Sequence, residues 1–308
     1  MQRGATTRKG AVDTMSAPTT TIRLNNGTPM PALGLGVYQS PPEQTIAAVE
    51  AALSEGYRLI DTAAAYGNEE QVGQAVKHSG LPRDEVFITT KLWISDYGYD
   101  TALRAFDASA NKLGSDYVDL YLLHQPVPTT FDATVAAYRA LERLLADRRV
   151  EAIGVCNFSA QHLTDLMEQT DVTPAVNQVE VHPFFTQEAL RRRHAELGIT
   201  TQAWSPIGGV NVYWRGGASA GSPLEHPTIV EIATRHHKTP AQIILAWHVE
   251  HGNSAIPKSV HRERIDENAA IGDIALSAEE MASIDALDTG VRGGPDPDSI
   301  TLDYGSRR

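Results

Sequence analysis

The sequence predicts a (β/α)8 barrel, and three observations support that prediction. Its 308 residues are enough for one large α/β barrel or for two modest domains. Eight short strand-like runs follow one another along the chain, with helical patterns between them. Polar and aromatic residues gather where these runs end, which is where such barrels carry their chemistry.

A short hairpin precedes the regular alternation. In TIRLNNGTPMP the step Asn26-Gly27 stands between two short apolar-polar stretches, and Asn-Gly is typical of a tight β-turn. We then expect the eight barrel strands at residues 33–37, 57–61, 86–91, 117–124, 150–155, 175–181, 199–204 and 254–257.

The segments between the strands carry helical signals. In FDATVAAYRALERLL, apolar residues return every three or four positions, as on one face of a helix. These residues are Phe131, Val135, Tyr138, Leu141 and Leu145. Thr239 and Gln242 form a predicted capping box, and Gly252 can end the helix that follows it. Ser277 and Glu280 repeat the capping box before the last predicted helix.

A doubly wound sheet is the alternative fold, and the motifs argue against it. A dinucleotide site of that kind needs G-x-G-x-x-G, whereas the nearest match begins at Gly34 and has Gln39 in place of the third glycine. The chain also has no P-loop, H-E-x-x-H or G-x-S-x-G pattern. His248 and His251 lie three residues apart on a predicted helix. Without a third candidate ligand we expect solvent-facing histidines there rather than a metal site.

The composition limits the partners and the compartment. A formal net charge of −12 should repel nucleic acid and anionic membranes, so an anionic ligand needs a local basic pocket. The single cysteine, Cys156, excludes an internal disulfide framework and suits the reducing cytoplasm. No apolar run approaches the length of a membrane span. We expect residues 1–20 to be a flexible tail without a secretory signal, and residues 21–308 to be one monomeric barrel domain.

Residues at the carboxyl ends of the predicted strands form a candidate active site. In chain order they are Tyr38, Asp61, Lys91, His124, Cys156-Asn157, Gln178, Trp204 and Lys258. A purely structural barrel would carry mostly apolar or small residues at these ends. Here one ring holds an acid, a lysine, a histidine, amides and aromatics, and this concentration indicates an active site.

Tyr66 follows Asp61 closely enough to act beside it as a proton donor. A free tyrosine has a pKa of about 10 and is a poor but available donor at neutral pH. An ion pair between Lys91 and Asp61 would fix the ammonium beside Tyr66, and we expect that ammonium to lower the pKa of the phenol. His124 could bond a carbonyl oxygen from the other side. Each residue also has a structural explanation, but together the four suit proton donation to a developing alkoxide.

With these residues in place, the chain resembles the aldo-keto reductase superfamily from about residue 21 to its end. The matching stretches are GYRLIDTAAAYGNEEQVG, TTKLW, YVDLYLLHQP, GVCNFS, NQVEVHP and IPKS, with RIDEN following. The chain looks most similar to the bacterial branch that includes 2,5-diketo-D-gluconate reductases. The resemblance implies a barrel that binds NADPH without a Rossmann fold and passes a hydride to an aldehyde or ketone. Tyr66 would then be the general acid, Lys91 and Asp61 would tune it, and His124 would orient the carbonyl.

The resemblance also implies contacts to the nicotinamide end of NADPH. Asn157 and Gln178 would pair with the carboxamide, and Trp204 would offer a flat face for the ring. Ser205, which follows Trp204, belongs to the same set. Cys156 stands where the family often has serine, so one bond to the carboxamide is weakened or lost.

At the other end of the coenzyme, Lys258, Ser259 and Arg264 form a local cationic patch on an acidic protein. A phosphate on the adenosine ribose would select that patch, since arginine can bond a phosphate with two parallel hydrogen bonds. Glu267 and Asn268 fall where the family contacts adenine. The structural alternative is a set of exposed basic residues at the start of a helix.

Residues near the barrel mouth are the candidates for substrate contacts. Tyr38 and Trp93 are expected as apolar walls, and Gln125 stands where many relatives have tryptophan, which suggests a more polar carbonyl. The segment 207–227, with Tyr213 and Trp214, is expected to be a mobile loop over the cofactor, and the tail after residue 289 another wall.

Two further functions stay open at this point. One is an NADPH-binding barrel with a regulatory or structural role and little turnover. The other is a metal-assisted hydrolase that uses His124 and Asp61, for which the sequence offers no ligand cluster.

Overall fold

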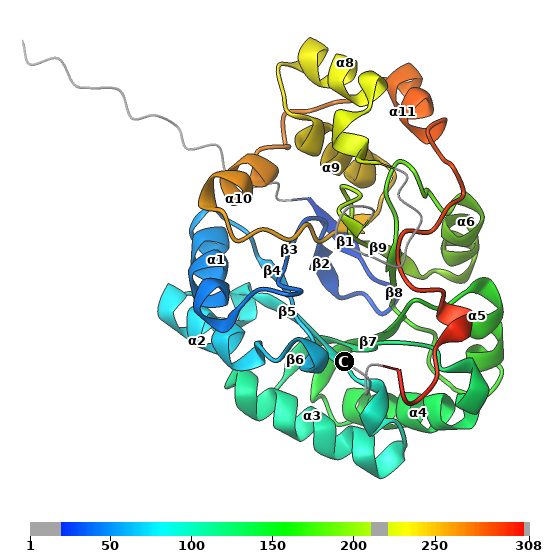
Figure 1. The fold of residues 1–308 in the computed structure, drawn as a ribbon. Helices are drawn as coiled ribbons and strands as arrows, with labels where there is room; N and C mark the ends of the chain where they lie inside the picture. The colour runs from blue at the N-terminus through cyan, green and yellow to red at the C-terminus, as the bar shows by residue number, and fades with distance from the viewer. Residues whose placement is uncertain (1–19, 211–220, 305–308) are drawn as a thin grey trace, which may run out of the picture.

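The structure is a computed structural model that describes residues 20–210 and 221–304. The predicted tail, except for Thr20, lies outside the described residues. Figure 1 shows the helices arranged around a central sheet, and this arrangement confirms the predicted (β/α)8 barrel with its amino-terminal hairpin. No helix in the described ranges combines the length and apolarity needed to cross a membrane.

Parallel strands form the barrel wall, each paired with the next in chain order. They are β3 (Leu35–Gly36), β4 (Leu59–Asp61), β5 (Phe87–Leu92), β6 (Val118–Leu123), β7 (Val150–Cys156), β8 (Val176–Glu180), β9 (Thr200–Trp204) and β10 (Ser254–Ala255). Each overlaps the run predicted for it, although the first and last strands are shorter than expected.

The wall closes between its first and last strands. The backbone N–H of Gly34 donates to the carbonyl of Ala255 at 2.9 Å, and that of Gly36 donates to Pro257 at 3.1 Å. A Cβ at position 36 would lie 2.8 Å from the carbonyl oxygen of Ile256, so only glycine lets the chains approach this closely. A doubly wound sheet has two open edges, and this closure therefore excludes it.

Helices cover the outside of the wall. They are α1 (Pro42–Ser54), α2 (Glu69–Ser79), α3 (Tyr99–Leu113), α4 (Phe131–Ala146), α5 (Ala160–Met167), α6 (Glu188–Leu197), α8 (Pro227–His236), α9 (Pro240–Glu250), α10 (Arg262–Ala269) and α11 (Ala278–Asp285). Short 3-10 turns lie between elements: η1 (Ala64–Tyr66), η2 (Arg83–Glu85), η3 (Ile94–Asp96), η4 (Pro128–Thr130), η5 (Pro223–Glu225) and η6 (Pro297–Ser299). Both predicted capping boxes are confirmed, at the starts of α9 and α11.

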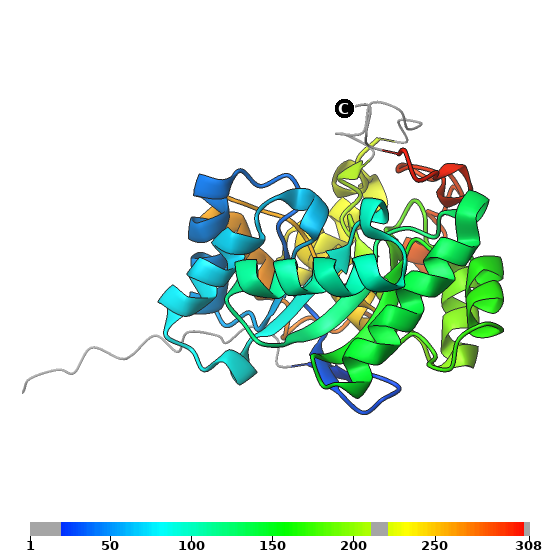
Figure 2. The same ribbon diagram turned by 90° about the horizontal axis from the view of Figure 1, so that it is seen from below.

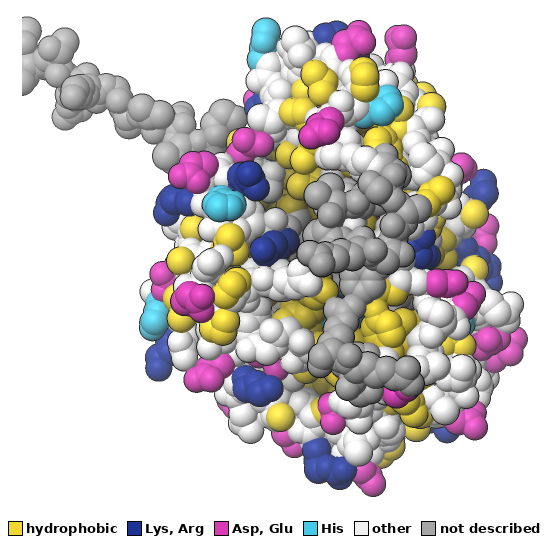
Figure 3. All heavy atoms as spheres, in the orientation of Figure 1, with side chains coloured by type: hydrophobic (Ala, Val, Ile, Leu, Met, Phe, Trp, Pro, Cys, Tyr) yellow, Lys and Arg dark blue, Asp and Glu magenta, His cyan; other side chains and the backbone are white. Residues whose placement is uncertain are grey.

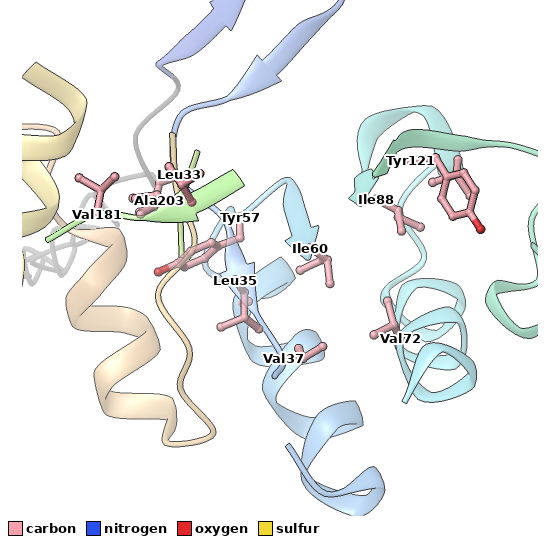
Figure 4. Close-up of a cluster of buried hydrophobic side chains, with 14 of the residues drawn as sticks. Leu33, Leu35, Val37, Tyr57, Ile60, Val72, Ile88, Tyr121, Val181 and Ala203 are labelled. Atoms are coloured by element: carbon pink, nitrogen blue, oxygen red, sulfur yellow. The ribbon is translucent and has the colours of Figure 1, made fainter. Parts of the chain in front are cut away.

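Alternate residues of each strand face opposite sides, and this produces two apolar layers. The outer layer packs between the sheet and the helices and includes Leu35, Ile60, Ile88 and Tyr121 (Figure 4). The inner layer fills the barrel and includes Leu59, Phe87, Leu120, Leu122 and Val176. Asp61, Lys91, His124 and Gln178 continue the inner-layer positions at even spacing. The same alternation that packs the barrel therefore directs these polar side chains into its mouth.

The hairpin covers the opposite end of the barrel. Strands β1 (Thr21–Arg23) and β2 (Pro29–Pro31) pair antiparallel around the predicted turn, where Gly27 has φ of 90°. Met30 is fully buried and belongs to the inner layer. Figure 2 shows the hairpin at one end of the molecule and the carboxyl-terminal segment at the other. The hairpin therefore covers the amino-terminal end of the strands, on the opposite side from the polar residues that continue the inner layer.

The expectation of solvent-facing histidines on α9 is wrong for His248. Its side chain is fully buried, and its Nε2 lies 3.0 Å from the carbonyl oxygen of Pro206. Burial lowers the pKa of His248 to about 3, so the ring is neutral. His251 is partly buried, with Nε2 2.9 Å from Oδ1 of Asp285. The reason is that α9 is packed on nearly all sides, which the three-residue spacing of two histidines does not reveal.

Candidate active site

Lys91, Asp61 and Tyr66 meet inside the barrel mouth, at the ends of β4 and β5. The Nζ of Lys91 donates to Oδ1 of Asp61 at 2.6 Å, to the carbonyl of Thr62 at 2.9 Å and to the hydroxyl of Tyr66 at 3.3 Å. An ammonium has three donors, and these contacts account for all of them. The Lys91 side chain is also fully buried, so its position is fixed by packing as well as by bonding.

Burial and contacts act in opposite directions on these groups. Burial by itself lowers the pKa of Lys91, but Asp61 and Tyr66 hold that pKa above its ordinary value, so Lys91 stays charged at neutral pH. Burial raises the pKa of Asp61, and Lys91 and Gln178 act against that rise. Burial also raises the pKa of Tyr66 and outweighs the lowering by Lys91. Lys91 thus lowers the pKa of Tyr66 as predicted, but the net pKa is raised, because desolvation of a phenolate exceeds its attraction to one ammonium.

A short loop places Tyr66 over the barrel. It contains η1 and ends at Gly67, whose φ of 69° lies in the left-handed region that favours glycine. The buried side chain of Asn68 ties this loop to the end of β3, since its Nδ2 donates to the carbonyl of Val37 at 2.9 Å. Its Oδ1 accepts from the hydroxyl of Thr62 at 2.7 Å. Asn68 was not among the predicted site residues, although an Asn directly after a turn glycine is a signal for such a tether.

His124 faces Tyr66 across the mouth. Its backbone N–H donates to Leu92 at 3.1 Å, and its ring centroid lies 5.7 Å from that of Tyr66 and 5.0 Å from that of Trp93. Burial, and then Lys91, hold the pKa of His124 well below its usual range. The imidazole is therefore neutral and can donate one hydrogen bond to an uncharged oxygen. Its buried Nδ1 has no partner among the described residues.

Asn157 links His124 to Trp204. Its Nδ2 donates to the backbone carbonyl of His124 at 3.1 Å, and its Oδ1 accepts from Nε1 of Trp204 at 2.8 Å. Asn157 and Ser205 both follow strands and both have positive φ, 64° and 51°. The hydroxyl of Ser205 accepts from the backbone N–H of Val210 at 2.8 Å. Each amide atom of Asn157 has capacity for one more bond, so a carboxamide can still pair with it.

Gln178 forms more hydrogen bonds within the protein than the sequence suggested. Its Nε2 donates to Oδ2 of Asp61 and to Oε1 of Gln202, each at 2.7 Å. Both amide hydrogens are used, so only its carbonyl oxygen can bond a ligand. Gln202 was missed because it lies inside a predicted strand, away from its end. Cys156 is buried in the inner layer, and burial raises the pKa of its thiol.

Two cations of the predicted patch are open to solvent. Lys258 and Arg264 are exposed, and neither side chain forms a hydrogen bond or ion pair with another described residue. Arg262, on the same helix as Arg264, contrasts with them because it bonds Glu55 at 2.5 Å. Two basic side chains without a partner among the described residues are available to bind an anionic group such as a phosphate, although the chain as a whole is acidic.

The other predicted contacts near α10 also hold the fold together. The hydroxyl of Ser259 accepts from the backbone N–H of His261 at 3.1 Å at the start of the helix. Glu267 accepts a 2.6 Å bond from Thr239, which caps α9. Asn268 is buried, with 5% of its surface exposed. The donor set from Asn157 to Arg264 fits NADPH, with amides and an indole at one end and free cations at the other.

The carboxyl-terminal segment lies beside the predicted substrate wall. Tyr304 has its ring centroid 6.5 Å from that of Trp93. Ile300 is fully buried in a small cluster with Ile94 and Val127. The structure therefore brings residues after position 289 to the barrel mouth, at the end shown uppermost in Figure 2.

The remaining predicted wall residues differ in their surroundings. Tyr38 lies 5.0 Å from Tyr66 between ring centroids. Gln125 is nearly buried, and its backbone is fixed by Tyr97, whose hydroxyl donates to the carbonyl of Gln125 at 2.6 Å and accepts from its N–H at 3.1 Å. Tyr97 was missed, since it lies in the loop beyond a strand end. The predictions for Tyr213 and Trp214 lie outside the described residues.

The exposed charged side chains of this face lie mainly around the mouth, whereas the ion pair of Lys91 and Asp61 is buried inside it. Figure 3 shows acidic and basic side chains mainly near the rim of this face, with hydrophobic side chains closer to its middle. In residues 20–210 and 221–304, no three His, Cys, Asp or Glu side chains group in a way that could hold a metal ion.

Comparison with known proteins identifies the family. The model of the aldo/keto reductase family matches residues 26–289. The chain is similar to morphine 6-dehydrogenase of Pseudomonas putida, with 51% identity over 93% of this chain and 97% of that protein. It is similar to glyoxal reductase of Bacillus subtilis, with 44% identity over 91% and 97%. A solved structure of a Gox0644 mutant in complex with NADPH matches with a TM-score of 0.84 and 40% identity, over 92% of this chain and 98% of the other.

These matches cover nearly the whole barrel, and they agree with the geometry of its mouth. They support NADPH-dependent carbonyl reduction and do not favour a binding barrel without turnover. The chain belongs to the aldo/keto reductase family of NADPH-dependent oxidoreductases.

Proposed function

We propose that this enzyme reduces small aldehydes and α-dicarbonyl compounds, with Tyr66 as the proton donor. One observation carries the assignment of Tyr66: its hydroxyl lies 3.3 Å from an ammonium that is itself held by Asp61. A buried cation at this distance stabilises the charge that appears on the phenol oxygen as the proton leaves. The raised pKa of Tyr66 keeps the proton in place until then.

The other residues of the mouth have complementary roles. His124 is neutral and lies across from Tyr66, so it can donate to the same carbonyl oxygen and orient it. Asp61 keeps Lys91 charged and in position. Bound NADPH would supply the hydride. The residues assigned to hold it are Asn157, Gln178, Trp204, Ser205, Lys258, Ser259, Arg264, Glu267 and Asn268.

The substrate proposal is supported by the aromatic character of one wall. Trp93 and Tyr304 form an aromatic wall beside His124, which suits a flat or short carbonyl compound. Tyr38 and Gln125 are the other assigned wall residues. Glyoxal reductase among the relatives supports α-dicarbonyls. The resemblance to 2,5-diketo-D-gluconate reductases adds diketo sugar acids as a narrower candidate within the same class.

We also propose that residues 21–308 form one domain that works as a cytoplasmic monomer. The single cysteine is compatible with a reducing compartment, and the family model spans one barrel. A molar mass of one chain in light scattering would support the monomer, and a doubled mass would contradict it.

The test is NADPH consumption with glyoxal, methylglyoxal, a nitrobenzaldehyde and a diketo sugar acid. Tyr66→Phe should lower kcat/KM by about 10²- to 10⁴-fold, the contribution of a general acid, while NADPH binding is retained. Wild-type rates in that variant would contradict the role of Tyr66. Binding of NADPH without consumption of any carbonyl would instead favour a regulatory barrel.

A further inference from the structure

A buried carboxylate holds the carboxyl-terminal segment to the barrel. Glu180 is the last residue of β8 and is fully buried. Its Oε1 accepts from the backbone N–H of Gly293 at 2.7 Å, and its Oε2 accepts from that of Gly294 at 2.9 Å. The Nε2 of His182 lies 3.1 Å from Oε1, and a guanidinium nitrogen of Arg292 lies 4.0 Å from Oε2. Both oxygens are thus bound, in a geometry that only a carboxylate can satisfy.

The same two glycines bring the segment against Trp204. A Cβ at position 294 would lie 2.5 Å from Cη2 of Trp204 and 3.0 Å from Oε2 of Glu180. The backbone at Gly294 therefore abuts the benzo edge of the indole. Glu180 and Trp204 are also register partners on β8 and β9, so the carboxylate and the indole are neighbours on the sheet.

The indole is thereby held at two places. Its Nε1 donates to Asn157 at 2.8 Å, and its benzo edge is in contact with the backbone of Gly294. A ring bound only through Nε1 could still tilt about that bond. The contact with Gly294 restricts this tilt, in addition to the packing of Trp204 against the inner layer, and Glu180 accepts a hydrogen bond from the backbone of Gly294.

We infer that Glu180 is a positioning residue for the nicotinamide: by fixing Gly293 and Gly294 against Trp204, it sets the plane on which the coenzyme ring stacks. The inference rests on the proposed function, which assigns Trp204 to that ring. Glu180 acts through Trp204 and the glycine pair. A mispositioned indole weakens stacking, and the loss expected for such an aromatic pair is roughly two- to tenfold in a dissociation constant.

A second contact holds the carboxyl-terminal segment to the barrel and provides a control for the experiment. Oδ1 of Asp298 lies 3.1 Å from Nε2 of His162 on α5, and Asp298 belongs to η6, beyond the glycine pair. Asp298→Asn therefore loosens the same segment at a different point and leaves the contact with Trp204 unchanged. If any loosening of the segment weakened coenzyme binding, this variant would show it as well.

Two substitutions test the inference by different routes. Glu180→Gln keeps the size of the side chain but replaces one acceptor oxygen by a donor, so one glycine N–H loses its partner. Gly294→Ala leaves the carboxylate intact and places a methyl group against the indole. In a titration that follows tryptophan fluorescence, each should raise the dissociation constants of NADPH and NADH by the same factor, roughly two- to tenfold. The two coenzymes differ only in the phosphate on the adenosine ribose, so equal weakening excludes an effect at that phosphate and is the result expected for a change at the shared nicotinamide.

The outcomes separate the inference from the proposed function. Dissociation constants equal to wild type in a folded Glu180→Gln and a folded Gly294→Ala, checked by circular dichroism, would overturn the inference and leave the function standing. A loss as large in Asp298→Asn would overturn it too, since position 294 would then have no special role. A wild-type chain that binds neither coenzyme would overturn the proposed function and this inference with it. If Glu180→Gln proves too unstable to titrate, Gly294→Ala decides.

Discussion

The ammonium of Lys91 lies 2.6 Å from Oδ1 of Asp61, and their side chains are 0% and 2% exposed. Two charges removed from water in this way cost several kcal/mol each, and their mutual attraction repays the cost only when the geometry is good. The bonds from Lys91 to Thr62 and Tyr66, and from Gln178 to Asp61, satisfy the remaining donors and acceptors. The barrel therefore tolerates this buried ion pair because the donors of Lys91 and both oxygens of Asp61 all have hydrogen-bond partners.

Removing one partner of this pair should be severely destabilising. Lys91→Met leaves the carboxylate of Asp61 buried without its cation, and we expect the free energy of unfolding at pH 7 to fall by about 3–5 kcal/mol. The double variant Lys91→Met with Asp61→Leu has no uncompensated charge and should recover most of the loss. Urea denaturation measures both. A single variant as stable as wild type would mean that Asp61 takes up a proton at little cost.

The buried histidines should make the fold sensitive to mild acid. Burial lowers the pKa of His194 to about 4 and that of His248 to about 3, whereas a histidine in the unfolded chain titrates near about 6.5. Between about pH 6.5 and these lower values the unfolded chain binds more protons, so stability is complete above about pH 6.5 and falls as the pH decreases. At about pH 5, each of these two histidines should lower the free energy of unfolding by about 2 kcal/mol relative to neutral pH.

Urea denaturation across about pH 5–7 checks this expectation, with His248→Gln as the comparison. Glutamine can also bond the carbonyl of Pro206, which lies 3.0 Å from Nε2 of His248. The variant should lose stability less steeply on acidification than wild type, even if it is less stable at neutral pH. Identical slopes would show that His248 does not contribute to the acid sensitivity.

The cationic patch should discriminate between the two coenzymes. Lys258→Ala combined with Arg264→Ala should weaken NADPH binding by roughly tenfold or more, since two bonds to a charged phosphate are lost, and should leave NADH binding nearly unchanged. The matched control is Arg262→Ala, which removes a cation from the same helix that is paired with Glu55. Equal weakening of NADPH and NADH in a binding titration would refute the assignment of the patch.

Gly73 should be required for the packing of α2 on α3. A Cβ at this position would lie 2.4 Å from the carbonyl oxygen of Leu113, and a backbone atom cannot easily move away. Gly73→Ala gains about 1 kcal/mol in helix propensity, but overpacking of this kind costs about 1–3 kcal/mol, so we expect net destabilisation. Thermal unfolding measures it, with Gln74→Ala on the exposed side of α2 as a control that should change little. A rise in the melting temperature of Gly73→Ala would contradict the expectation.

Local sequence signals predicted the framework well. The barrel strands, the hairpin at Asn26-Gly27 and the capping boxes at Thr239 and Ser277 all depend on residues close together in the chain. The alternation of side chains along a strand also brings Asp61 and Lys91 together, because both residues occupy inner-layer positions near the ends of their strands. For such features the physical cause lies within a few residues, so a single sequence contains it.

Sequence patterns predicted less well those properties that depend on burial or on contact with a residue far away in the chain. Tyr66 has a raised rather than a lowered pKa, because the net desolvation depends on everything packed around its ring. His248 is in the core rather than in solvent, because neighbouring elements cover the face of α9 that carries it.

By itself, the sequence determined the barrel, the caps of its helices and the residues that end its strands. The tertiary structure alone decided that Glu180 binds Gly293 and Gly294 and that Gln178 is committed to Asp61 and Gln202. Glu180 and Gly294 are 114 positions apart in the chain. Contacts over such separations form only when the whole barrel closes, since no local pattern of hydrophobicity or turn chemistry specifies which distant groups will meet.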